Sequence, residues 1–123
     1  MPIQKDLCGV GLVPAAAKYI AGDVETGVTA TGSSSQANSY ALKYAHTVFS
    51  TTAANTGARL RADLIAGDSG SVQNNGASTL FLYPPVGGSI NGGSANAKVD
   101  VATLKGAHWM STNGLDFSVI VGA

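Results

Sequence analysis

The residues that look most like catalytic machinery are Gly67-Asp68-Ser69-Gly70, with His46 upstream. A serine between glycines, with a histidine to accept its proton, is the pattern of a serine hydrolase. Such an enzyme also needs a buried aspartate and an oxyanion hole, which two barrels build together, and 123 residues are too few for two barrels. A turn of Gly, Asp and Ser between two strands explains the same letters. A small hydrolase using Ser69 and His46 is therefore kept only as a third hypothesis.

Two glycine-rich stretches could cradle phosphate groups, but each lacks a required part. Gly9-Val10-Gly11 opens like a dinucleotide-binding turn, yet Pro14 stands where the third glycine belongs, and no apolar strand precedes it. Residues 87–93 lack the Lys-Ser or Lys-Thr ending of a phosphate-binding loop and lead into no helical pattern. The sequence therefore predicts no cofactor.

Metal ligands of the soft kind are few and scattered. Cys8, His46 and His108 are far apart in the sequence, without the paired spacing of a zinc site, so no metal site is predicted. We expect His46 to be hydrogen-bonded in the interior or at an interface. His108 and Trp109 are neighbours in a predicted strand, so their side chains should point to opposite faces, with Trp109 in the core.

Aromatic side chains suggest one further chemistry, the binding of sugars. A single Trp109 with Tyr19, Tyr40, Tyr44 and Tyr83 could form a stacking platform on a β-sandwich. The carboxylates show no close pair in the sequence of the kind that glycoside hydrolysis requires. A carbohydrate-binding or fibre module is therefore the second hypothesis, and a glycosidase is not favoured.

Composition favours a protein whose surfaces are covered by other protein. Only 11% of the residues are charged, and seven positive side chains balance seven negative ones. Soluble domains usually carry about 25% charged residues, and binding to nucleic acid needs clustered Lys and Arg, so nucleic acid is not predicted as a direct partner. No stretch approaches the apolar length that spans a bilayer, and the amino terminus does not read as a secretion signal, so we expect synthesis in the cytoplasm and no membrane partner. Cys8 is the sole cysteine, which excludes an internal disulfide.

The chain divides into an amino-terminal part, residues 1–38, and a body, residues 39–123. Pro14 followed by AAAKYIAG predicts a short helix that ends at Gly22. The polar stretch from Val24 to Ser39 has no sustained period and predicts an extended arm. From Ser39 onward about seven short strands recur every ten residues or so, which predicts an all-β fold, an antiparallel jelly-roll-like sandwich or barrel. Asn75-Gly76 is expected to turn a hairpin between Val72 and the strand that follows.

Residues 80–93, LFLYPPVGGSINGG, form the most distinctive stretch. Its first four residues are apolar on both faces, which is typical of a central strand covered by the core on one side and by a second layer or a neighbouring subunit on the other. Pro84 and Pro85 should end the strand, and the glycines should let the chain turn so that Ile90 reaches the core. The residues expected at the core or at an interface are Leu80, Phe81, Leu82, Tyr83, Ile90, Trp109 and Phe117.

Residues 57–121 resemble the jelly-roll-like structural proteins of tailed-bacteriophage virions, which include capsid decoration (cement) proteins and head-fibre or tail-associated modules. The resemblance depends most on Pro84-Pro85 with the following Gly-Gly-Ser-Ile-Asn-Gly, then on the strand through Val99 and Val101, and on Trp109. It implies a protein without enzymatic activity that binds the outer surface of a capsid and bridges neighbouring major capsid subunits. It further implies self-association as a dimer or trimer, through apolar faces and a pliable arm.

Overall fold

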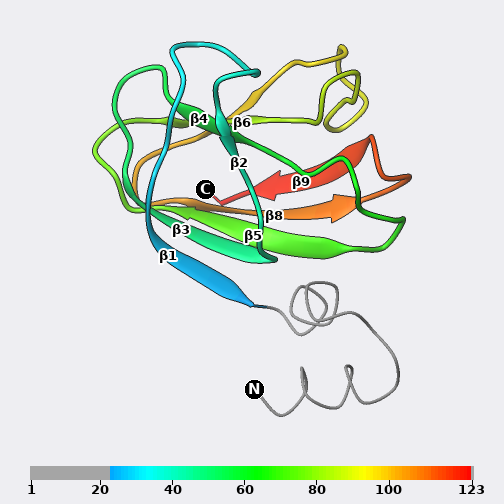
Figure 1. Cartoon of the computed structure of the whole chain (residues 1–123), viewed down its shortest axis with the longest axis horizontal. Helices are drawn as coiled ribbons and strands as arrows, with labels where there is room; N and C mark the ends of the chain where they lie inside the picture. The colour runs from blue at the N-terminus through cyan, green and yellow to red at the C-terminus, as the bar shows by residue number, and fades with distance from the viewer. Residues whose placement is uncertain (1–22, 123) are drawn as a thin grey trace.

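The computed structural model describes residues 23–122, and the predicted helix and Cys8 lie outside them. The described chain is all-β and contains no helix. Two sheets face each other, with five strands in the lower layer of Figure 1 and four in the upper layer. The prediction of an all-β fold is therefore confirmed.

Nine strands make up the two sheets of residues 23–122. The five-stranded sheet has the order β1-β3-β5-β8-β9, and the four-stranded sheet has the order β2-β4-β6-β7. Their bounds are β1 Val24–Thr29, β2 Tyr40–Ala41, β3 His46–Thr51, β4 Gly57–Arg59, β5 Ser69–Asn74, β6 Leu80–Tyr83, β7 Val99–Val101, β8 Gly106–Ser111 and β9 Phe117–Val121.

The expectation of antiparallel sheets is wrong for the first six strands. β1 pairs with β3, β3 with β5, β2 with β4, and β4 with β6, all in parallel. Only the pairs β5–β8, β6–β7 and β8–β9 in the described chain are antiparallel. Strand spacing along a sequence indicates about how many strands there are, but not which sheet each strand joins. The parallel pairing therefore could not be predicted from the spacing. A jelly roll is an antiparallel fold, and the pairing of the first six strands differs from it.

The first six strands alternate between the two sheets, so the chain winds around the core as in a short β-solenoid. In the larger sheet, Val24 pairs with His46, 22 residues later, and His46 pairs with Ser71, 25 residues later. A parallel pair needs a long crossover connection, usually a helix. Here a strand of the opposite sheet takes the place of that helix, and the last three strands close the body in antiparallel fashion.

The hairpin predicted around Asn75-Gly76 does not form, because β5 and β6 belong to different sheets. Neither residue has the positive φ angle of the expected turn. Instead the side chain of Asn74 holds this crossing. Its Oδ1 accepts hydrogen bonds from the Gly76 amide and from Thr52 Oγ1, and its Nδ2 donates to the carbonyls of Ser78 and Val101. Asn74 is fully buried and connects β5 of one sheet to β7 of the other.

Part of the predicted arm belongs to the body. Val24–Thr29 is the edge strand β1, and Val28 and Ala30 lie in the hydrophobic core. The segment that follows, residues 31–39, lies over the outside of the smaller sheet, where Gln36 Nε2 donates to the Pro84 carbonyl and Arg59 donates to the carbonyl of Ser39. This strand could not be predicted from the alternation of residues, because β1 contains Gly27, with φ of 69°, and a register shift, which break the period of two.

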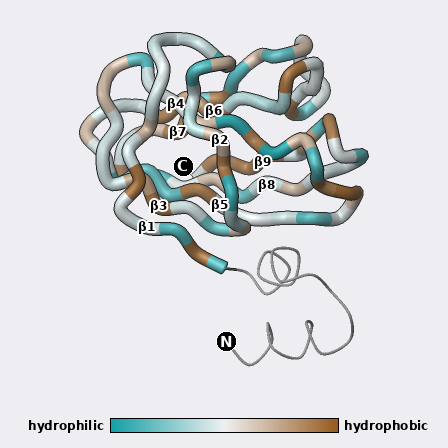
Figure 2. The backbone as a smooth tube through the Cα atoms, in the orientation of Figure 1, coloured by the Kyte–Doolittle hydropathy of each residue, from teal (hydrophilic) through white to brown (hydrophobic). Residues whose placement is uncertain are grey.

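One hydrophobic core fills the space between the sheets. Figure 2 shows hydrophobic and hydrophilic residues alternating along the strands, as expected when one face of each sheet is buried. Six of the seven residues expected at a core or interface are buried, namely Leu80, Leu82, Tyr83, Ile90, Trp109 and Phe117. Phe81 is half-buried on the outside of the smaller sheet, where Lys98 Nζ lies 4.0 Å from the centre of its ring. The chain itself therefore covers both faces of β6.

Candidate functional site

The Gly67-Asp68-Ser69-Gly70 motif forms a turn that leads into β5. Asp68 Oδ2 accepts a hydrogen bond from the Ile65 amide, and the Asp68 carbonyl accepts one from the Ser111 amide. Gly70 is needed for packing, because a Cβ atom there would lie 1.8 Å from the Ala45 carbonyl oxygen and 2.6 Å from the Trp109 ring. The motif thus has a structural explanation in turn formation and close packing.

His46 contacts a different serine from the one singled out in the sequence. Its Nδ1 lies 2.8 Å from Oγ of Ser71, its register partner on β5, and no hydrogen bond joins it to Ser69. Both side chains lie on the outer face of the larger sheet, because Thr47 and Val72, the next residues along each strand, are buried. The prediction that His46 is hydrogen-bonded is confirmed, but its side chain is half-buried on the outer face of the sheet and does not lie in the interior.

Trp109 is a core residue, so it cannot stack on a sugar. Its side chain is 1% exposed and packs edge-on against Phe117, with ring centres 5.8 Å apart. His108 is exposed on the opposite face of β8, as the alternation predicts. A sugar-stacking platform built on Trp109 is therefore ruled out.

The loop from Pro84 to Gly93 closes the edge of β9. The Ser89 carbonyl accepts a hydrogen bond from the Phe117 amide, and the Asn91 amide donates to the Phe117 carbonyl. Asn91 then uses its side chain like a strand residue: Nδ2 donates to the Val119 carbonyl at 2.9 Å, and Oδ1 accepts from the Val119 amide at 2.8 Å. This glycine-rich loop acts as a structural clamp.

Asp116 fastens the same loop to the turn before β9. Its Oδ1 accepts from the amide and the hydroxyl of Ser89, and its Oδ2 accepts from Asn113 Nδ2. The hydrogen bond from Asn113, followed by that from Ser89, lowers the pKa of the Asp116 carboxyl. A lowered pKa keeps this carboxyl ionised, so its role here is that of a hydrogen-bond acceptor.

Tyr40 and Glu25 bridge the two sheets beside β1 and β2. The Tyr40 hydroxyl donates to Glu25 Oε1, and the Tyr40 ring packs edge-on against Phe49, with ring centres 5.9 Å apart. Burial, together with this hydrogen bond, raises the pKa of Tyr40 to about 12. The Tyr40 hydroxyl therefore keeps its proton at ordinary pH and donates it in the hydrogen bond to Glu25.

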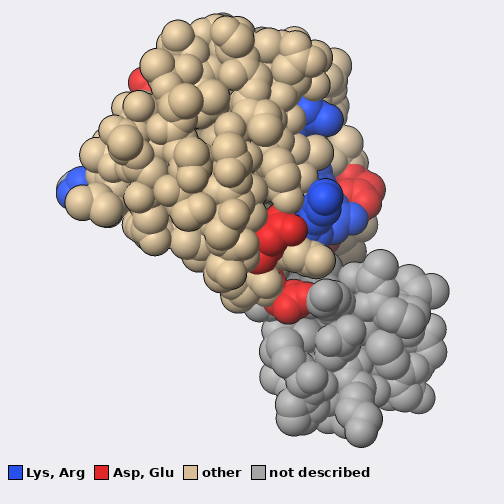
Figure 3. Space-filling view, turned by 60° about the vertical axis from the view of Figure 1, so that its left-hand side comes forward, with Lys and Arg blue, Asp and Glu red and all other residues tan. Residues whose placement is uncertain are grey.

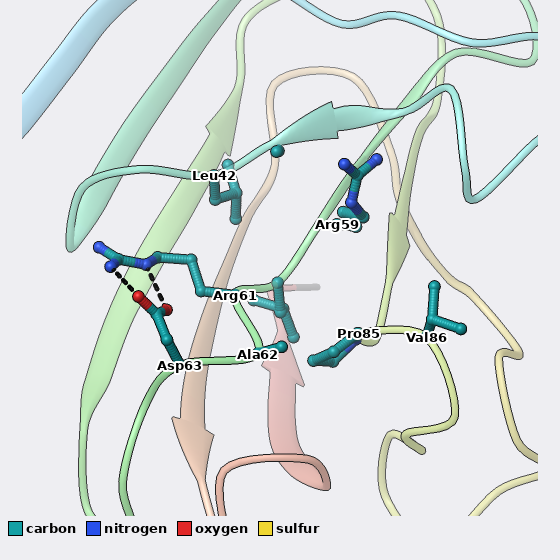
Figure 4. A pocket seen from close by; sticks show the side chains of 9 residues that line it. Leu42, Arg59, Arg61, Ala62, Asp63, Pro85 and Val86 are labelled. Carbon is teal, nitrogen blue, oxygen red and sulfur yellow. Dashed lines mark hydrogen bonds and ion pairs between the residues drawn. The ribbon is translucent and has the colours of Figure 1, made fainter.

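A surface depression of about 330 Å³ lies at the end of β4, between residues 59–63 and the Pro85-Val86 corner. Figure 4 shows that the side chains of Arg59 and Arg61 extend in different directions and that Arg61 pairs with Asp63. Arg59 donates to three backbone carbonyls of residues 36–39. The hydrogen bond from Arg61 lowers the pKa of Asp63. Because these cations already have partners within the chain, the depression offers little free charge to a ligand.

The outer face of the larger sheet is broad and uncharged. In its five strands only Glu25 carries a charge, and that side chain turns inward to Tyr40. Apolar Ile120 is 72% exposed on β9, and Met110 is exposed on β8. Figure 3 views the molecule from the side, across both layers, and on this side the charged side chains of the described residues lie mainly toward the margins. A face of this kind is suited to contact with protein.

All four sheet edges carry features that hinder the addition of another strand. β1 is interrupted by a register shift at Gly27, β9 is clamped by Asn91, and β2 has two residues. β7 has three residues and carries the exposed ion pair of Lys98 with Asp100. Bulges, short strands and charges are the usual protections of edge strands. Protein contacts are therefore more favourable on a sheet face than at an edge.

Residues 23–122 contain no group of three His, Cys, Asp or Glu side chains placed to hold a metal ion. Within the same range no helix is long and apolar enough to cross a membrane. Comparisons of the chain with protein-family models, with curated proteins and with solved structures found no match.

Sequence reasoning missed four residues that organise these sites: Ser71, Asn74, Asn91 and Asp116. Each acts through partners on another strand or loop, so its spacing in the sequence carries no signal. Asn91 could have been noticed, because an Asn before a glycine pair in a loop tolerates a positive φ, here 55°.

Proposed function

We propose that this chain is a structural protein of a tailed-bacteriophage virion without enzymatic activity. In this proposal it is a capsid decoration protein that binds the outer capsid surface and bridges neighbouring major capsid subunits. The observation that carries the proposal is the uncharged outer face of the larger sheet, with Ile120 exposed on it and with the sheet edges protected. The sequence resemblance of residues 57–121 supports it. The parallel pairing of the first six strands does not add support for a jelly roll.

The size of this face supports the proposal that the chain self-associates. Five strands about 4.8 Å apart, each of roughly six residues, present on the order of 500 Å² in plan. Each partner in a standard interface buries about 800 Å², so one copy alone would bind weakly. A dimer or trimer that engages several coat subunits at once gains affinity through effective concentration. Sedimentation of the pure protein measures this association directly.

The test is co-sedimentation with heads assembled from the coat protein of the virus that encodes this chain. We expect saturable binding, and an Ile120→Glu variant should bind at least tenfold less because it places a charge on the face. Leu104→Glu is the matched control, because Leu104 is also 72% exposed but lies in the turn between β7 and β8. If the chain stays in the supernatant at every concentration, the proposed function is wrong. If Ile120→Glu binds like the parent chain, the face is wrong and the function stands.

A further inference from the structure

Two histidines and a serine lie side by side in one row across the outer face of the larger sheet. His46 pairs with Ser71 in the β3–β5 ladder, and Ser71 pairs with His108 in the β5–β8 ladder. Neighbouring strands are about 4.8 Å apart, so the two histidine Cα atoms are about 10 Å apart, with Ser71 between them. Two imidazole rings can reach toward a common point above the serine across such a gap.

The hydrogen bond of His46 directs its ring toward this point. Nδ1 lies 2.8 Å from Ser71 Oγ, so the ring leans over β5 in the direction of β8. When Nδ1–H donates to Oγ, the lone pair of Nε2 is available. Metal-binding histidines usually have this arrangement, in which the second ring nitrogen donates to an oxygen that fixes the tautomer and the ring orientation.

The surroundings also favour a cation. No Lys or Arg belongs to the five strands of this sheet, so none of their side chains repels a metal ion. The row ends in the exposed apolar side chains of Val24 and Ile120, which do not compete as ligands. Imidazole nitrogens suit Zn²⁺, Cu²⁺ and Ni²⁺, whereas Mg²⁺ and Ca²⁺ prefer oxygen ligands.

We propose that His46 and His108 form a two-histidine site for a divalent transition metal such as Zn²⁺ or Ni²⁺, with Ser71 positioning His46. Solvent completes the coordination shell in the isolated chain. The inference does not depend on the proposed capsid function, because it concerns the chain by itself. It goes beyond the sequence, in which the two histidines lie 62 positions apart (46 to 108).

The test is calorimetric titration of the untagged full chain with Zn²⁺ and, separately, with Ni²⁺. All variants carry Cys8→Ser, because a cysteine thiolate is itself a strong metal ligand. We expect saturable binding of one ion per chain. His46→Gln and His108→Gln should each weaken binding at least tenfold, and Ser71→Ala should weaken it about tenfold, as loss of an orienting partner does.

Ser69→Ala is the matched control, because Ser69 is a second serine on β5, is exposed, and makes no hydrogen bond to His46. It should bind the ions like the parent chain. His108 is exposed, so His108→Gln should fold and decides the question even if His46→Gln does not. Since the chain has two histidines, NMR provides a second measurement: the signals of both rings should shift together on addition of Zn²⁺. Absence of saturable binding, or parent-like binding by His108→Gln, would overturn the proposal.

Discussion

Tyr40 makes the stability of the protein sensitive to alkaline pH. Burial, together with the hydrogen bond to Glu25, raises its pKa from the ordinary value of 10.0 to about 12, so the folded state retains the phenolic proton when the unfolded chain has begun to lose it. The stabilisation from the neutral phenol is fully present below pH 10 and is lost as the pH rises through about 12. We expect the stability advantage of the parent chain over Tyr40→Phe to shrink across this window.

Urea unfolding of both chains at intervals from pH 8 upward measures this difference. The other tyrosines are present in both proteins, so their contributions to the difference in stability cancel. A difference between the two chains that stays constant up to pH 12 would show that the Tyr40 hydroxyl does not have the raised pKa.

Asn74 should be among the most sensitive polar positions. All four of its hydrogen bonds are made inside the protein, so Asn74→Ala leaves buried partners such as the Gly76 amide and the Val101 carbonyl unsatisfied. An unsatisfied buried group costs about 1–3 kcal/mol, and we expect a loss of about 3 kcal/mol in the free energy of unfolding. The exposed neighbour Asn75→Ala should change it by about 1 kcal/mol or less. Equal effects of the two variants in chemical denaturation would contradict this role.

At the scale of the elements, the clamp on β9 predicts a specific loss of edge protection. Asn91→Ala removes both side-chain hydrogen bonds to Val119 and leaves the strand edge open. Asn96→Ala is a close control, because Asn96 also has a positive φ, 66° against 55°, and bonds only the Gly87 amide through its side chain. We expect Asn91→Ala to be less stable than the control by about 1 kcal/mol.

The same variant should also associate through its exposed edge as its concentration rises. Light scattering at increasing concentration compares the two variants. Identical scattering and stability would show that Asn91 does not guard the edge of β9.

Most strands after residue 39 were predictable in position, but β1 and the partners of the strands were not. The strand predicted around His108 and Trp109 is β8, and Pro84 marked the end of β6. Sheet membership depends on contacts between distant residues, so the crossing at Asn74 was mistaken for a hairpin. The same limit applied to the candidate site: the sequence indicated His46, but its partner Ser71 follows from the parallel register of β3 and β5.

Across the whole molecule, one core joins both sheets, so a destabilising substitution in one sheet should also lower the stability of the other. Leu80 is fully buried on β6 of the smaller sheet, whereas Trp109, the single tryptophan, reports from the larger one. We expect Leu80→Ala to lower the free energy of unfolding by about 2–5 kcal/mol. Ser69→Ala, on the surface of β5, should change it by about 0.5 kcal/mol or less.

Tryptophan fluorescence and far-ultraviolet circular dichroism should follow the same transition in Leu80→Ala. Two separate transitions, with fluorescence unchanged by the substitution, would mean that the sheets unfold independently. Such a result would also contradict a single shared core.

The winding of the first six strands governs how such a chain can change in length. Tandem duplication of one complete circuit, about two dozen residues, would add one strand to each sheet. The side chains of all the existing strands would keep their inward or outward orientation. Insertion of one residue within a strand would instead reverse the orientation of the side chains beyond it. Longer descendants of this architecture should therefore differ from it by whole circuits, with the antiparallel closing strands carried along unchanged at the end.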